Sequence, residues 1–146
     1  MTEAPPSPII DSKAGWVKKQ IDEYLATGGK RPVFRYGAPL VLITTQGRKS
    51  GDWLRTCLIG TSDGDDVVVV ASKGGAPSHP AWYLNLESTP RVWVQQGAES
   101  FWTTAHTADA TEKPRLWDLM VGYYKDYAEY QKKTDRDIPV VVLVRD

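Results

Sequence analysis

Three β-strand patterns follow one another directly in the first half of the chain, and this feature most constrains how it folds. Apolar and β-branched side chains fill residues 40–45, 54–61 and 66–72, and residues of these types favour strands. Turns rich in glycine, serine and aspartate separate the three patterns at residues 47–51 and 62–65. A doubly wound sheet needs a helix between successive strands, so the pattern favours a mainly antiparallel sheet or barrel.

The remaining elements add helices around this sheet. Helices are predicted from Ala14 to Thr27, from about Pro80 to Leu86, and after Thr111, and further strands over residues 91–96, 100–108 and 140–144. Ser78 and Thr111 are expected to cap the second and third helices. The order predicts an α+β fold, a barrel of about six mainly antiparallel strands with flanking helices. We expect one domain over residues 13–146 after a mobile, proline-containing tail at residues 1–12.

Charge and composition exclude several classes of protein. The 146 residues include 18 basic and 18 acidic side chains, so no general affinity for nucleic acid or an anionic membrane is expected. A single cysteine, Cys57, rules out an internal disulfide and a multi-cysteine metal site. The lack of a transmembrane run or signal-peptide pattern predicts a cytoplasmic protein. Membrane association through the amphipathic helix at residues 14–27 is the less favoured alternative to packing on the core.

Two glycine-rich basic segments are candidate anion-binding sites. The first is the run Gly47-Arg48-Lys49-Ser50-Gly51, which has the components of an anion-binding nest but not the spacing of a P-loop. An ordinary exposed turn is an equal alternative. The second is the run Ser72-Lys73-Gly74-Gly75-Ala76, directly after a valine-rich strand. Its alternative is a solvated lysine in a flexible connection. Together with Arg55, the cations of both runs predict phosphate binding.

Tyrosines recur at helical spacing near the third helix. They are Tyr123, Tyr124, Tyr127 and Tyr130. Positions three and four residues apart share a helix face, and a tyrosine stripe suits the wall of an apolar pocket that needs hydroxyl groups. Ordinary packing of a helix on a sheet is the alternative, and is slightly favoured from the residues alone.

Familiar catalytic sets are absent from the sequence. The two histidines, His79 and His106, have no metal-binding spacing and are interpreted as structural. No nucleophile-elbow motif occurs, and Cys57 lies in a predicted strand, where a buried structural cysteine is the simpler interpretation. If the chain is an enzyme, a cofactor must therefore supply the reactivity.

Three runs of sequence resemble the deazaflavin-dependent nitroreductase and quinone reductase family. They are Thr44-Thr45-Gln46-Gly47-Arg48-Lys49-Ser50-Gly51, residues 71–86 (ASKGGAPSHPAWYLNL), and residues 130–139 (YQKKTDRDIP). The resemblance covers roughly residues 14–146, and the second run is its most diagnostic part. It implies a split β-barrel of the FMN-binding superfamily that uses reduced coenzyme F-420, an 8-hydroxy-5-deazaflavin with a phosphate and an oligoglutamate tail. The implied reaction is hydride transfer to quinones, activated enones and some nitroaromatics.

The resemblance also implies roles for individual residues. Those implied to bind the cofactor are Arg48, Lys49, Ser50, Arg55, Ser72, Lys73, Gly74, Gly75, Ala76, Trp82 and Asn85. Those implied to line the substrate pocket or act in catalysis are Ser72, Tyr124, Tyr127 and Tyr130. No metal is expected, and the expected partner is a small-molecule electron acceptor, with the protein a monomer or a homodimer.

The chain departs from the family pattern in two places. Arg55 lies one position later than the family arginine, which predicts either a bulge or a side chain on the other face of the strand. Ile59 and Gly60 replace two family tyrosines, which predicts a wider pocket. The alternatives to an F-420-dependent reductase are an FMN-dependent split-barrel oxidoreductase and a non-catalytic carrier of the deazaflavin or a lipid.

Overall fold

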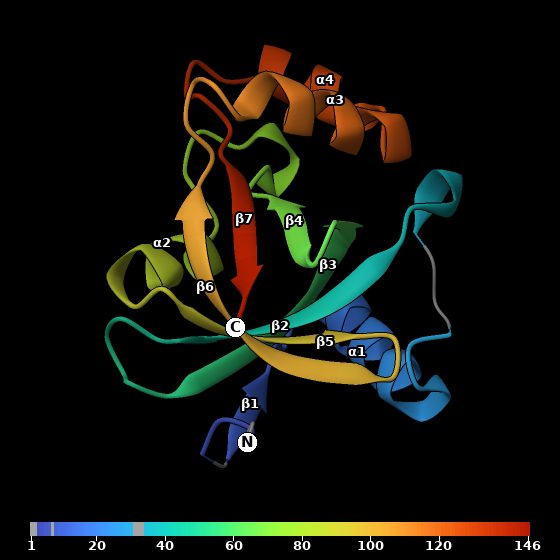
Figure 1. Ribbon diagram of the computed structural model, residues 1–146, viewed down its shortest axis with the longest axis vertical. Helices are drawn as coiled ribbons and strands as arrows, with labels where there is room; N and C mark the ends of the chain where they lie inside the picture. Colours follow the sequence, from blue (N-terminus) through green and yellow to red (C-terminus); the bar gives the residue numbers. More distant parts are fainter. Residues whose placement is uncertain (1–2, 7, 31–33) are drawn as a thin grey trace.

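Six antiparallel strands close a β-barrel in the computed structural model, which describes residues 3–6, 8–30 and 34–146 (Figure 1). The strands are β2 (Leu40–Gln46), β3 (Trp53–Asp63), β4 (Asp66–Val70), β5 (Arg91–Gln96), β6 (Glu99–Thr107) and β7 (Val140–Arg145). Their order around the barrel is β3-β2-β5-β6-β7-β4, and β4 closes the ring by pairing with β3. The α+β split-barrel prediction is confirmed.

Four α-helices and two short 3-10 helices accompany the barrel. They are α1 (Gly15–Thr27), α2 (Ala81–Ser88), α3 (Lys113–Tyr123), α4 (Asp126–Lys132), η1 (Arg35–Gly37) and η2 (Lys73–Gly75). Helix α1 ends where expected, because Gly28 adopts a left-handed φ of 62° and its N–H bonds back to the helix. Figure 1 shows α3 and α4 together at one end of the molecule, with α1 and α2 on different sides of the barrel.

The alternation of side chains along each strand divides the core in two. The barrel interior contains one set of strand residues, including Val41, Val67 and Val69. The opposite set, including Leu42 and Val68, packs outside the barrel beneath α1, α3 and α4. All four consecutive valines of β4 are therefore buried, as a strand covered on both faces requires.

The N-terminal segment differs from the expected tail. Ile9–Asp11 form strand β1, which pairs in parallel with β3 opposite residues 53–55. The N–H of Ser12 donates to the carbonyl of Arg55 at 2.9 Å, and the indole N–H of Trp102 donates to the carbonyl of Glu3. Residues 9–11 are thus part of the sheet where the sequence predicts a mobile tail.

Two helix starts and one helix length also differ from prediction. Pro80, not Ser78, is the N-cap of α2, with no side-chain capping bond. At the third helix, the Asp109 carboxylate accepts bonds from the N–H groups of Thr111 and Glu112, so Thr111 is not the cap. The expected long helix is two helices, because the chain leaves helical geometry at Tyr124 with φ −142° and ψ 93°.

Candidate active site

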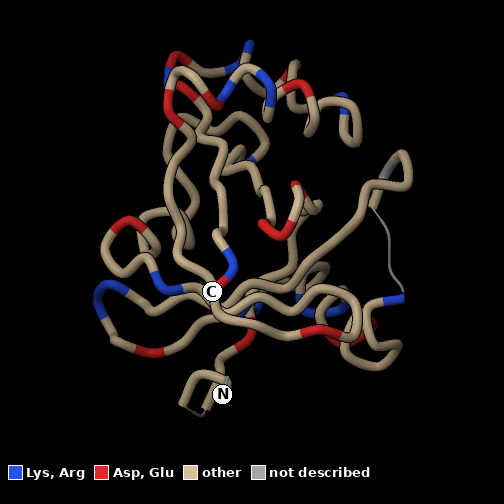
Figure 2. Tube along the Cα trace, viewed as in Figure 1, with Lys and Arg blue, Asp and Glu red and all other residues tan. Residues whose placement is uncertain are grey.

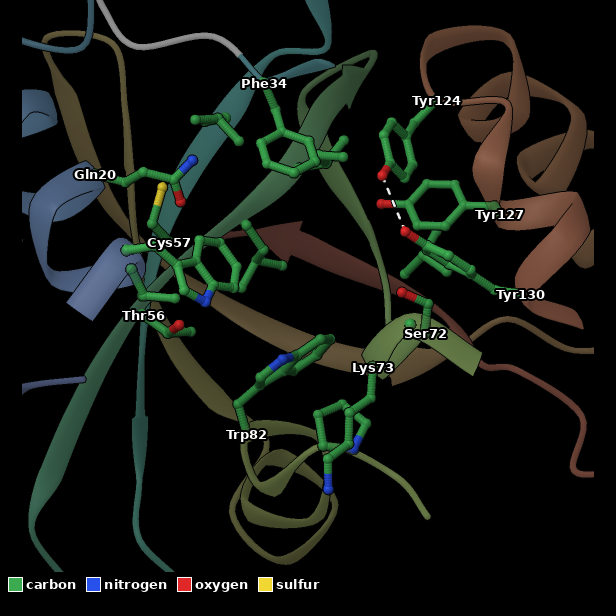
Figure 3. Close-up of a pocket in the computed structure, with 18 residues that line it drawn as sticks. Gln20, Phe34, Thr56, Cys57, Ser72, Lys73, Trp82, Tyr124, Tyr127 and Tyr130 are labelled. Atoms are coloured by element: carbon green, nitrogen blue, oxygen red, sulfur yellow. Dashed lines mark hydrogen bonds between the residues drawn. The ribbon is translucent and has the colours of Figure 1, made fainter. Parts of the chain in front are cut away.

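A cavity of about 520 Å³ lies between the outer wall of the barrel and the elements α1, η2 and α4 (Figure 3). Its walls are mostly apolar and aromatic, and include Trp16, Phe34, Trp82 and the three tyrosines discussed below. Ser72 and Lys73 add polar groups at one side. A concave apolar cavity with a few convergent polar groups is the usual form of a small-molecule site.

Tyr124, Tyr127 and Tyr130 gather on one side of this cavity. The hydroxyls of Tyr124 and Tyr130 are hydrogen-bonded at 3.0 Å, and the Tyr127 ring packs edge-on against that of Tyr124 with centroids 5.0 Å apart. Figure 3 shows the three hydroxyl ends facing the cavity. The helix break at Tyr124 does not separate the trio, since α4 begins two residues later. Tyr123 is instead 42% exposed.

Burial makes two of these hydroxyl groups weaker acids than an ordinary tyrosine. It raises the pKa of both Tyr124 and Tyr127 above the usual value for tyrosine, and the neighbouring Tyr130 raises the pKa of Tyr124 further through their hydrogen bond. At neutral pH both groups therefore remain O–H donors. The cavity thus presents a cluster of neutral proton donors in an apolar wall.

The run from Ser72 to Ala76 forms a tight turn that packs against α4 at the side of the cavity. Lys73, Gly74 and Gly75 have φ values of 46°, 63° and 81°, which only glycine adopts without strain. A Cβ on Gly75 would lie 2.6 Å from the carbonyl oxygen of Tyr130, so the second glycine is required by close packing on α4. Both glycines of the predicted run thus have a structural reason, and Lys73 lines the cavity beside Ser72.

A second cavity of about 470 Å³ adjoins the first, because Thr56 and Trp82 line both. Its other walls come from β1 and the following residues, from β3 and from α2, and include Lys13, Arg55 and Asn85. Thr45 also lines it, and its buried hydroxyl has no hydrogen-bond partner among the described residues. Such a group can be satisfied by water or by a bound molecule, and the hydroxyl of Thr44, which lines neither cavity, is likewise without a partner among the described residues.

Arg55 lines this second cavity, but its side chain lies on the face of β3 opposite to that of Leu54 and Thr56, as the second alternative predicted. The pairing of β2 with β3 runs in unbroken register from Gln46–Trp53 to Leu40–Ile59, with Arg55 opposite Thr44. The Arg55 guanidinium is paired with the Asp11 carboxylate, at 2.6 Å from Nε, and it also donates to Gln95. The bulge alternative is wrong, and the charge of Arg55 already has an acidic partner in β1.

The run from Gly47 to Gly51 is an exposed turn between β2 and β3. The three residues between the glycines are exposed: Arg48, Lys49 and Ser50. Figure 2 shows the basic segment at this turn, next to strands that carry few charged residues. Ser50 accepts a hydrogen bond from the N–H of Asp52, which stabilises the turn itself. Only Arg48 reaches toward the second cavity, where its guanidinium and its N–H both donate to the side-chain oxygen of Asn85.

The two family tyrosines that this chain lacks have different consequences. Ile59 lines the first cavity. Gly60 instead faces the barrel interior, where a Cβ would lie 2.5 Å from Val41. Only the replacement at Ile59 therefore alters the wall of the first cavity, and the expected widening of that cavity at Gly60 is wrong, because Gly60 lines a separate cavity of about 270 Å³.

The remaining reactive side chains are held in structural roles. Burial raises the pKa of the Cys57 thiol to about 12, so it stays protonated at the cavity wall. His106 lies 3.1 Å from Glu112, and His79 contacts a guanidinium through Nδ1. Within the described ranges, no three histidine, cysteine or acidic side chains are grouped to hold a metal ion. None of the helices described is long and apolar enough to cross a membrane.

Asp11 and Thr45 are site residues that the sequence does not single out. Asp11 reaches Arg55 only because β1 pairs with β3, 44 residues further along the chain. A local pattern could have indicated Thr45, since two threonines follow four apolar residues in this strand. A hydroxyl that is buried there needs a hydrogen-bond partner. The tertiary pairing of a short edge strand has no comparable signal.

Together the two adjoining cavities suit an elongated molecule with a planar apolar part and an anionic end. The aromatic walls of the first cavity suit the planar part, and the cations and hydroxyls around the second cavity suit the anionic part. The closed six-stranded barrel and this site define a split-barrel oxidoreductase that binds a flavin-like cofactor.

Comparison with known proteins identifies the family. Residues 16–145 match the F420H(2)-dependent quinone reductase family. An F420H(2)-dependent quinone reductase of Mycobacterium tuberculosis is 39% identical over 110 residues, which cover 73% of this chain and 74% of that protein. The chain therefore belongs to the F420H(2)-dependent quinone reductase family.

Two solved structures resemble this one at similar identity. One, described as an F420-H2 dependent reductase, is 42% identical with a TM-score of 0.68, over 77% of this chain and 98% of that one. The other, described as a domain-swapped dimer, is 40% identical with a TM-score of 0.69, over 90% of this chain and 99% of that one. Both likenesses support the fold, and the first also supports the family.

Proposed function

We propose that this chain transfers a hydride from reduced coenzyme F-420 to quinones and activated enones, with nitroaromatics as further acceptors. Membership of the family gives the class, an F-420-dependent reductase. The range of acceptors is the proposal. The observation that supports it best is the cluster of three tyrosine hydroxyls facing an apolar cavity beside Ser72 and Lys73.

Two groups of residues are proposed to hold the cofactor. Ser72, Lys73, Gly74, Gly75 and Ala76 would hold its deazaflavin end in the first cavity, with Trp82 at the junction. Arg55, Asn85, Arg48, Lys49 and Ser50 would lie along its anionic end. The unpartnered Thr45 hydroxyl and Lys13 in the second cavity support this direction. When bound, the reduced cofactor would supply the hydride, which carries two electrons.

The protein's own residues are proposed to position the acceptor and to complete its reduction with a proton. An acceptor that gains a hydride needs one proton at the oxygen or nitrogen where negative charge develops. Tyr124, Tyr127 and Tyr130 present O–H groups to the cavity, and burial holds the pKa of the first two high enough to keep them protonated. The Ser72 hydroxyl is a further donor. The apolar walls exclude water and strengthen these hydrogen bonds.

Turnover with a soluble quinone tests the function. The chain would be mixed with reduced F-420 and menadione, and reoxidation of the cofactor followed by its absorbance. We expect multiple turnovers per protein molecule, and none when FMN replaces F-420. Binding of F-420 without turnover of any quinone, enone or nitroaromatic would support the carrier alternative instead.

A homodimer is a further part of the proposal. The 40% identical solved structure is a domain-swapped dimer, which supports a dimer here. Light scattering of the purified protein decides between a monomer and a homodimer. A cytoplasmic location stays a prediction.

A further inference from the structure

The Arg136 side chain joins both ends of the cofactor turn. Its Nη1 donates to the carbonyl of Ala71 at 3.1 Å, its Nη2 to that of Ser72 at 2.6 Å, and its Nε to that of Ala76 at 2.8 Å. Nη1 also lies 3.0 Å from Nδ1 of His79. One guanidinium therefore bonds to the residues that precede, begin and end the turn.

This arginine is bound by backbone carbonyls in place of an acid. Within the described part of the chain, the side chain of Arg136 bonds to three carbonyls and to His79 and to no carboxylate. Burial lowers the pKa of its guanidinium from the usual value without deprotonating it. Hydrogen bonds from a charged donor are stronger than those between neutral groups. A planar fork with five N–H donors can reach carbonyls in several directions at once. The arrangement suits a clamp on the backbone.

The clamped turn is one that needs external support. Lys73 is a non-glycine residue with a φ of 46°, in the left-handed region that L residues avoid. Such a conformation persists where the surroundings over-determine it. The turn's own bonds are two: Gly75 N–H to Ser72 carbonyl at 2.9 Å and Ala76 N–H to Lys73 carbonyl at 3.1 Å. The bonds from Arg136 add three more.

The clamp also connects the turn to the tyrosine wall. The side-chain amide of Gln131, in α4, donates to the carbonyl of Arg136 at 2.8 Å and accepts from the N–H of Ile138 at 3.0 Å. Gly75 packs directly on the backbone of Tyr130 in the same helix. The segment that carries Arg136 is therefore fixed to the helix that carries Tyr127 and Tyr130.

We infer that Arg136 is a positioning residue of the reductase, which fixes Lys73 of the turn at a set place relative to the tyrosines. It acts from behind the turn through the backbone and does not line either cavity among the described residues. The inference rests on the proposed function for the role of Lys73. The clamp itself is independent of that function.

A double-mutant cycle tests whether Arg136 acts through Lys73. The dissociation constant of oxidised F-420 is measured by fluorescence titration for the unmodified chain, Arg136→Met, Lys73→Ala and the double variant. We expect Arg136→Met to weaken binding about tenfold in the presence of Lys73 and about twofold or less in its absence, since coupled residues are non-additive. Equal factors in the two backgrounds would overturn the inference, because they indicate a general structural effect.

Two further variants control for charge and for loss of an arginine. Arg136→Lys keeps the charge but cannot reach carbonyls at both ends of the turn, so binding should stay weakened. Arg115→Met removes an exposed arginine paired with Asp63 and should leave binding unchanged. If Arg136→Met does not fold, Arg136→Lys takes its place in the cycle.

Hydrogen exchange provides a measurement that needs no cofactor. In Arg136→Met the amides of Gly75 and Ala76 should exchange about tenfold faster, because their turn loses its clamp. Unchanged exchange at both amides would overturn the inference. Failure of the unmodified chain to bind F-420 would count against the proposed function, and the exchange rates would then decide the role of Arg136 by themselves.

Discussion

The two glycine-rich basic turns are alike in sequence and different in the structure. Each has two glycines, a serine and a lysine directly after a buried strand. The run at 47–51 is an exposed hairpin turn that its own backbone and Ser50 stabilise. The run at 72–76 has three successive positive φ values and packs against α4, with its lysine lining a cavity.

This difference shows what composition leaves out. Glycine, serine and lysine permit a tight turn and an anion contact, but they are also typical of any solvated turn. What distinguishes the two turns is the tertiary surroundings, since the second packs its backbone on α4, whereas the first contacts α2 through the bonds of Arg48 to Asn85. The second turn is expected to matter more for stability and for cofactor affinity than the first.

The largest expected effect is on stability, and two glycine substitutions isolate it. Gly75 and Gly51 have similar φ values of 81° and 77°, but a Cβ meets the Tyr130 backbone at Gly75 and nothing within 4 Å at Gly51. We expect Gly75→Ala to lower the free energy of unfolding by about 3 kcal/mol or more. Gly51→Ala should cost about 1 kcal/mol, from backbone strain alone. Urea denaturation measures the free energy of unfolding of both variants. Equal losses in the two variants would show that the packing of the second turn on α4 does not contribute to stability.

The next effect is on cofactor affinity, and two lysines compare the turns directly. Lys73→Ala should weaken F-420 binding about twentyfold, because Lys73 lines the first cavity, although its side chain is exposed and its ammonium donates to Ser78 at 3.3 Å. Lys49→Ala should weaken binding by about threefold or less, since Lys49 is exposed and lines neither cavity, so that solvent and salt screen its charge. Fluorescence titration measures both constants. An unchanged affinity in Lys73→Ala, or a larger loss of affinity in Lys49→Ala, would contradict the prediction that the second turn contributes more to cofactor binding than the first.

The tyrosines beside the second turn should affect turnover more than binding. Tyr127→Phe removes one hydroxyl donor, and we expect kcat with menadione to fall about tenfold, because the neighbouring hydroxyls replace part of its function. The F-420 dissociation constant should change little. Tyr123→Phe is the matched control, since Tyr123 is exposed. A loss of cofactor affinity with unchanged kcat would place Tyr127 on the cofactor side instead.

A smaller effect is expected at Asp11, which neutralises Arg55 beside the second cavity. Asp11→Asn removes one negative charge from a site proposed to hold an anionic group, so F-420 affinity should rise about threefold at low salt and less at high salt. Asp22→Asn, in α1, serves as the control. Weaker binding in Asp11→Asn would instead show that the ion pair is needed to orient Arg55.

The smallest expected effect is that of alkaline pH on turnover. Burial raises the pKa of Tyr124 and Tyr127 above the ordinary value of about 10. Because a raised pKa keeps the donors protonated, kcat should stay constant from neutral pH up to about 10. The pH profile of kcat measures this. A fall with a midpoint well below the ordinary tyrosine value, abolished in Tyr127→Phe, would contradict the burial effect.

The fold could be predicted from local patterns because the strands and turns have strong signals. The valine strand, the hairpin around Gly97 and the helix ending at Gly28 lie where their residue types indicate. The break at Tyr124 and the pairing of β1 with β3 depend on tertiary contacts that leave no periodic signal.

The candidate site could be predicted in part for the same reason. Helical spacing groups the tyrosines but slightly favours ordinary packing, and the resemblance to the family is what predicts that they line a pocket, as Tyr124, Tyr127 and Tyr130 do. The sequence does not predict the residues that act through long-range contacts. These are Asp11, which pairs with Arg55, and Arg136, which bonds to the turn at 72–76. Their partners lie more than 40 residues away in the chain, and their roles follow only from the folded arrangement.

Titration of the unmodified chain with oxidised F-420, in parallel with FMN, tests the cofactor site most directly. Fluorescence of each cofactor is followed as protein is added at micromolar concentration. We expect saturable binding of F-420 with one molecule per chain and no comparable binding of FMN. Failure of F-420 to saturate, or FMN binding of equal strength, would contradict the deazaflavin site.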